Sequence, residues 1–113
     1  MITEFWIEKI GGTSIDNATV QDTESVIREI IKTDQGIDTF WVGHKDKEYV
    51  LEIHKSLDLF LIFGENQDKR LQIKLKNWEQ VRDFIRHYFR GDFLRIKDEI
   101  ELRLSSNRLI SNR

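Results

Sequence analysis

The sequence predicts an α+β domain, in which an antiparallel meander sheet of about five strands carries two packed helices. The expected order is β-α-β-β-β-β-α, followed by a C-terminal element that closes the sheet. Between residues 37 and 75, four apolar bursts alternate with three short polar breaks, which is typical of four strands joined by hairpins. One segment on either side of that stretch has apolar residues at helical spacing.

Length and composition indicate one domain, residues 1–113, built around a single modest core. The chain has no cysteine, so disulfides and thiolate metal sites are excluded. No apolar run reaches the ~18 residues needed to cross a bilayer. The N-terminal segment carries acidic residues and lacks the basic flank of a signal peptide. We therefore expect a cytoplasmic protein with no membrane partner.

The N-terminal segment alternates as a strand does, with Trp6 on one side and Phe5 and Ile7 on the other. Gly11–Gly12 ends this strand. Residues 13–21 are polar and are expected to form a surface connection.

A first helix is predicted from about Thr23 to Asp34. Asp22 is a suitable N-cap residue, and Gly36 is a natural stop beyond the C-terminus. The apolar stripe that should pack on the sheet comprises Val26, Ile27, Ile30 and Ile31.

Three strands of the meander have different patterns. Residues 48–54 alternate, so that Glu52 and His54 are expected to face water. Residues 57–63 are apolar at nearly every position, which predicts a strand covered on both faces. Because two helices can share one face, the other face would need the C-terminal element or a partner. Residues 70–76 alternate with charged side chains, which suits an edge strand.

The second helix has the clearest helical signature in the chain. Asn77 is its expected N-cap, Gln80 follows three residues later as in a capping box, and Gly91 ends it. Residues 92–104 fit either a helix or a strand that closes the sheet. Residues 105–113 are expected to be frayed.

Charge is distributed unevenly along the chain. Residues 1–68 hold six Lys/Arg and fourteen Asp/Glu, a balance of −8, and residues 69–113 hold twelve and six, a balance of +6, which together give −2. If the halves do not interleave, one face is acidic and another basic, which favours charged macromolecular partners. The alternative is that the halves neutralise each other across the surface.

The turns Gly43–Lys47 and Gly64–Asp68 are candidate partner-binding loops, because they carry acidic residues at the tips of a rigid sheet. Phe40 and Trp41 are consecutive on a strand and point to opposite faces, so at least one belongs to the core. An exposed tryptophan at this place would be a suitable interface anchor. The predicted partner-binding residues are Trp41, His44, Asp46, Glu48, Glu65 and Asp68.

A second hypothesis is nucleic-acid binding by Arg82, Arg86 and Arg90, which form a row at four-residue spacing on the second helix. Glu79 and Asp83 would neutralise part of that row. A salt-bridged helix face is therefore favoured, and a nucleic-acid partner is not expected.

The third hypothesis is an enzyme built around His44 or His54. The serines lie outside any nucleophile-elbow pattern, and the Gly11–Gly12 pair lacks the spacing of a phosphate loop. The histidines lack the clustered spacing of a metal site. We expect no catalytic residue, no cofactor and no metal.

Several segments resemble small immunity proteins of bacterial polymorphic-toxin and contact-dependent inhibition systems. They are D-x-E-x-V-I-x-x-I from Asp22, T-F-W-V from Thr39, and W-x-x-V-x-x-F-I-x-x-x-F-x-G from Trp78. The resemblance covers about residues 5–93; beyond Gly91, members typically continue with an Arg-Pro pair and a Trp-containing strand, whereas this chain reads D-F-L-R-I. It implies a protein that is not an enzyme and that binds a cognate toxin domain, often a cationic nuclease, and blocks its active site or substrate surface.

Overall fold

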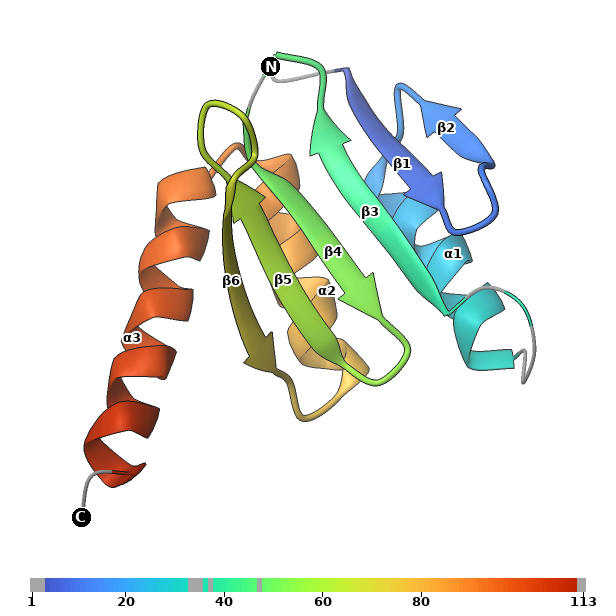
Figure 1. Ribbon diagram of the computed structural model, residues 1–113. Helices are drawn as coiled ribbons and strands as arrows, with labels where there is room; N and C mark the ends of the chain where they lie inside the picture. Colours follow the sequence, from blue (N-terminus) through green and yellow to red (C-terminus); the bar gives the residue numbers. More distant parts are fainter. Residues whose placement is uncertain (1–3, 33–35, 37, 47, 112–113) are drawn as a thin grey trace.

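The computed structural model of the chain describes residues 4–32, 36, 38–46 and 48–111, with side chains described up to Ser105. It contains a six-stranded antiparallel sheet in the order β2-β1-β3-β4-β5-β6 and three helices (Figure 1). The elements are β1 (Phe5–Lys9), β2 (Ser14–Asp16), α1 (Val20–Lys32), β3 (Thr39–His44), β4 (Val50–His54), β5 (Asp58–Phe63), β6 (Lys69–Lys74), α2 (Trp78–Phe89) and α3 (Phe93–Ser111). The predicted α+β meander is confirmed, with one more strand and a third helix.

Strand β2 is the element that the sequence did not predict, because a polar surface connection was expected there. Gly11 and Gly12 both have φ near +100°, a conformation that favours glycine, and they turn the chain back on itself. Ile15 then pairs with Ile7 of β1 and packs against the core. With a single apolar residue in three, β2 is too short to give an alternation signal.

Helix α1 begins three residues before the predicted start. Its N-terminus is a capping box in which the Asp22 N–H donates to Thr19 Oγ1 at 3.3 Å and the Thr19 N–H donates to Asp22 Oδ2 at 2.8 Å. Asp22 is thus the reciprocal partner of the N-cap rather than the N-cap itself. Ile31, which was predicted to lie on the buried stripe, is exposed. The predicted end, Asp34, lies outside the described residues.

One side of the sheet packs against the helices and forms the hydrophobic core. Alternate strand residues point to this side, namely Phe5, Ile7, Phe40, Val42, Leu51, Ile53, Leu59, Leu61 and Ile73. Helix α2 covers them with Val81, Phe84, Ile85 and Tyr88. Its capping prediction is confirmed, because the Gln80 N–H donates to Asn77 Oδ1 at 3.0 Å. The edge position predicted for residues 70–76 is also confirmed by β6.

Helix α3 resolves the open alternative for residues 92–104, which are helical from Phe93 onward. Phe93, Ile96 and Ile100 are buried in the core that α2 and the sheet share. The helix runs to Ser111 through most of the segment that was expected to be frayed, and residues 112–113 lie outside the described part. None of the described helices is long and apolar enough to cross a membrane.

In the part of the chain that the structure describes, the three helices leave the opposite side of the sheet uncovered. Figure 1 is viewed from that side, with α1 and α2 behind the strands and α3 beside β6. Strand β5 has apolar residues on both faces and was predicted to be covered on both. The C-terminal element therefore does not cover its open side. We call the uncovered side the open face; it comprises the strand residues that point away from the helices.

Candidate functional site: the open face of the sheet

The pairing register arranges the open-face residues in rows across the sheet. A continuous row crosses all six strands. From β2 to β6 it contains Ser14, Glu8, Trp41, Glu52, Phe60 and Gln72. The neighbouring row is interrupted where the β3–β4 ladder ends. It contains Asp16, Trp6 and Gly43 on one side of the interruption and Val50, Ile62 and Arg70 on the other.

Aromatic and aliphatic side chains give the open face an apolar centre. Trp6, Trp41, Phe60 and Ile62 are each partly exposed, and Val50 is only 5% exposed although no helix covers it. The indole of Trp6 lies directly over Gly43, where a Cβ atom would come within 2.0 Å of the ring. Glycine is thus needed at this position so that the Trp6 ring can lie flat on the sheet.

Glu52 is the buried carboxylate at the centre of the continuous row. It is 6% exposed and accepts hydrogen bonds from Trp41 Nε1 at 2.9 Å, Arg70 Nη2 at 2.8 Å and His54 Nε2 at 2.6 Å. Strand alternation predicted that Glu52 would face water, and this prediction is wrong. Alternation identified the face correctly, but the flanking side chains Trp41 and Phe60 exclude solvent from it.

The donors around Glu52 keep it ionised. Burial by itself would raise the pKa of Glu52, but hydrogen bonds from His54 and Trp41 and the positive charge of Arg70 outweigh that effect. The pKa of Glu52 therefore lies below its ordinary value of 4.5. Removing one partner of such a buried pair is strongly destabilising, because it leaves a charge uncompensated.

Glu52 in turn holds its neighbours in place. The Arg70 guanidinium lies 4.1 Å from the centroid of the Phe60 ring while it donates to Glu52, and 52% of its side chain remains exposed. The His54 ring lies 5.1 Å from Phe60, and its Nδ1 atom is 3.3 Å from Thr39 Oγ1. Trp41, Arg70 and His54 are thus held in place by contacts within the chain.

This arrangement suits recognition better than proton transfer. Both carboxylate oxygens of Glu52 and both ring nitrogens of His54 already have partners within the chain. Tryptophan and arginine dominate the binding energy of protein interfaces, especially where they are fixed in advance. The open face thus presents side chains of the types that act as anchors in protein interfaces, held by contacts within the chain.

The residues predicted from sequence are divided between two regions. Trp41 lies on the open face, whereas Asp46, Glu48, Glu65 and Asp68 are exposed in the two hairpin turns, at one end of the sheet. Lysines surround these turns as well. Lys45 lies 3.8 Å from Glu4, and Lys69 and Lys97 lie over the Phe63 ring. The acidic and basic halves of the sequence thus interleave at this end. Lys47, at the end of the first predicted turn, lies outside the described residues.

His44 is not at the surface. It is the last residue of β3 rather than part of the turn, and it points to the helix side with 8% exposure. Its ring packs edge-on against Phe5 at 5.0 Å, and its Nδ1 atom accepts a hydrogen bond from the Asp46 N–H at 3.0 Å. Its position in the sheet explains this burial, because alternation from Trp41 places His44 on the opposite side.

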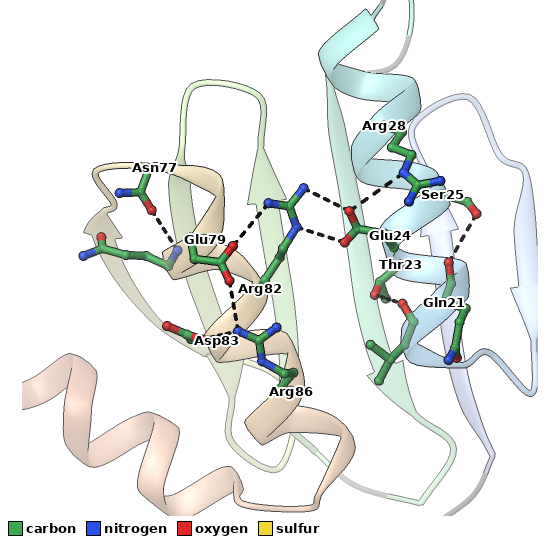
Figure 2. A network of polar contacts seen from close by, with 12 residues as sticks. Gln21, Thr23, Glu24, Ser25, Arg28, Asn77, Glu79, Arg82, Asp83 and Arg86 are labelled. Atoms are coloured by element: carbon green, nitrogen blue, oxygen red, sulfur yellow. Dashed lines mark hydrogen bonds and ion pairs between the residues drawn. The ribbon is translucent and has the colours of Figure 1, made fainter.

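The arginine row of α2 is largely paired. Arg82 donates twice to Glu24 of α1, both at 2.9 Å, and links the two helices (Figure 2). Arg86 pairs with Asp83 and with Glu79. These hydrogen bonds raise the pKa values of both arginines. Arg82 and Arg86 therefore belong to a salt-bridged helix face, as predicted from the sequence.

A concavity of about 590 Å³ lies between α2 and α3. Its apolar part is formed by Phe84, Ile96 and Leu102, and its rim carries Arg95 and Glu99. The opposite charges on this rim favour neither anionic nor cationic ligands. Within the described ranges, no three or more histidine or carboxylate side chains gather as metal ligands do.

Comparisons with protein-family profiles, with curated proteins and with solved structures find no significant match to this chain. The assignment of the open face as the candidate site therefore rests on its geometry. The sequence patterns indicated Trp41 but did not indicate that Trp6, Glu52, Phe60 and Arg70 belong to the same surface. Their common signal is their position in two neighbouring rows of the pairing register, which become visible only when the strands are aligned with one another.

Proposed function

We propose that this chain is a protein-binding domain that neutralises a bacterial toxin domain by holding it against the open face. The single observation that carries the proposal is the array of Trp6, Trp41, Phe60 and Arg70 on an uncovered sheet face, with Trp41 and Arg70 fixed by Glu52. The class of partner comes from the resemblance of the first helix, the T-F-W-V strand and the second helix to small immunity proteins.

The charges of the open face favour a protein partner over a nucleic acid. Exposed Glu8 and Asp16 stand at one edge, and Arg70 and Lys74 at the other, with Asp58 3.8 Å from Lys74. A phosphate backbone lying across this face would meet carboxylates as well as cations. A protein surface can carry charges of both signs and so complement both edges of the open face. Arg82 and Arg86 are already paired with carboxylates of the chain, which also favours a protein partner over a nucleic acid.

Co-expression with a toxin domain tests the function, and the candidate is any such domain that the reading frame adjacent to this chain's gene encodes. The wild-type chain should restore growth and bind the purified toxin domain in a calorimetric titration. Trp41→Ala and Ile62→Glu should each weaken binding by about 100-fold, in the range of interface hot spots. Leu102→Ala, on the exposed side of α3, is the matched control and should bind like the wild type. Melting temperatures separate lost binding from lost folding.

Two outcomes would contradict the proposal. If no complex forms with the toxin domain while generic RNA or DNA binds at low salt, the nucleic-acid alternative replaces it. If reversing the charges of Asp46, Glu48 and Glu65 together abolishes binding while Trp41→Ala leaves it intact, the hairpin turns are the binding site and the open face is not.

A further inference from the structure

The open face has charges of opposite sign at its two edges. Glu8 and Asp16, both exposed, lie on β1 and β2, and Arg70 and Lys74 lie on β6 with about half or more of each side chain exposed. Between these edges lies the apolar centre formed by Trp6, Trp41, Phe60 and Ile62. A surface with an acidic edge, an apolar centre and a basic edge is complementary to itself when it is turned around.

We propose that two copies of this chain associate face to face through their open faces, about a two-fold axis that runs parallel to the strands between β3 and β4. This axis places β2 over β6, β1 over β5 and β3 over β4 of the second copy. It preserves position along the strands, so each row lies over the same row of the second copy. Asp16 then faces Arg70 of the second copy, and Trp6 faces Ile62 of the second copy.

A two-fold axis in the plane of the interface can also run across the strands, and this axis brings like charges together instead of opposite charges. An axis across the strands places β2 over β2 and β6 over β6 of the second copy, so that the acidic edge lies over the acidic edge and the basic edge over the basic edge. Like charges in direct opposition disfavour that arrangement. The charge pattern therefore selects the axis parallel to the strands, and paired sheets of this kind normally pack about 10 Å apart.

The size of the face indicates a weak dimer. Six strands span about 24 Å, and the strands other than the short β2 have five to six residues and extend about 17 Å, which gives a projected area of at most about 400 Å². A stable interface buries roughly 800 Å² on each partner. We therefore expect a dissociation constant on the order of 100 µM. The same face is proposed for the toxin domain, so a tightly bound toxin would displace the second copy.

Sedimentation equilibrium of the purified chain, from about 5 µM to about 1 mM, tests the dimer without any partner protein. The wild type should pass from monomer to dimer. Asp16→Lys, which brings two like-charge contacts into each dimer by symmetry, should weaken it by about tenfold or more. Asp98→Lys reverses one exposed carboxylate on α3, away from the open face, and should leave the dissociation constant unchanged.

A gain-of-function variant tests the register. Ser14 and Gln72 are exposed at opposite edges of the sheet, in the same row, so they cannot pair within one chain. In the proposed dimer each faces the other across the interface. Ser14→Glu combined with Gln72→Lys should therefore tighten the dimer by about tenfold, with two new ion pairs per dimer.

A chain that stays monomeric up to about 1 mM overturns the proposal. So does a dimer that responds equally to Asp16→Lys and Asp98→Lys, because it would use another surface. Because the measurement uses the chain alone, its failure leaves the toxin-binding proposal standing, and failure to bind a toxin leaves the dimer standing.

Discussion

The indole nitrogen of Trp41 donates a hydrogen bond to Oε1 of Glu52 at 2.9 Å, between neighbouring strands on the open face. This contact joins a partly exposed indole to a buried carboxylate on the same surface. Because Glu52 also accepts hydrogen bonds from Arg70 and His54, its carboxylate organises the centre of the open face.

Glu52→Gln should destabilise the fold in a pH-dependent way. The pKa of Glu52 is lower in the folded chain than its ordinary value of 4.5, so its charge stabilises the fold above that value and this contribution is lost as the pH falls below it. At pH 7 the variant should lose about 2 kcal/mol of unfolding free energy. At about pH 3 the difference between the two proteins should shrink.

Urea unfolding at both pH values measures this effect, with Asp98→Asn on the surface of α3 as the control. A difference between wild type and Glu52→Gln that does not change with pH would show that the carboxylate charge is not what stabilises the network.

Gly43→Ala should be destabilising because of Trp6. A methyl group at residue 43 would come within 2.0 Å of the indole ring, which must then leave the sheet. Overpacking of this kind typically costs about 1–3 kcal/mol. Combining it with Trp6→Ala should remove most of the penalty, so the two changes should be clearly non-additive in thermal or urea unfolding. If the two effects are additive, the destabilisation by Gly43→Ala does not come from a clash with the Trp6 ring.

Arg82 and Glu24 should be energetically coupled across 58 residues of sequence. Their two hydrogen bonds connect α2 to α1, and both side chains are partly exposed. A double-mutant cycle with Arg82→Met and Glu24→Gln should give a coupling energy of about 1 kcal/mol. The coupling should decrease in about 1 M salt, because screening weakens exposed ion pairs. Zero coupling at low salt would mean that the helices pack independently of this contact.

Tyr88→Phe should lower stability at neutral pH and remove an alkaline transition. The Tyr88 hydroxyl donates to the Tyr49 carbonyl, and burial raises the pKa of Tyr88 above its ordinary value of 10.0. The neutral phenol therefore stabilises the fold below pH 10.0, and this contribution is lost as the pH rises above it. We expect a loss of about 1 kcal/mol at pH 7 and a smaller difference at about pH 11. An undiminished difference at the higher pH would contradict this role.

Local patterns predicted most of the fold. The capping residues Asn77 and Gln80, the edge strand near residue 70 and the opposite orientations of Phe40 and Trp41 were all predicted correctly. Each depends on neighbours within a few positions of the chain. Strand β2 was missed because only Ile15 marks it, and its pairing with β1 supplies the rest of its stability.

The site was less predictable because it depends on register. Trp41, Glu52 and Arg70 are separated by 11 and 18 residues in the sequence, and only strand pairing brings their side chains together. Alternation correctly placed Glu52 on the outer face, but its burial comes from neighbours on other strands. The charge asymmetry of the two halves did not produce an acidic end, because lysines from β6 and α3 lie beside the acidic turns.

The three tryptophans allow a direct test of the proposal that the open face binds a toxin domain. Trp6 and Trp41 lie on that face, and Trp78 packs on the helix side. In a ¹⁵N-labelled chain at low concentration, addition of the toxin domain should shift or broaden the indole signals of Trp6 and Trp41 and leave that of Trp78 in place. A complex that forms while only the Trp78 signal changes, or while none changes, would contradict the claim.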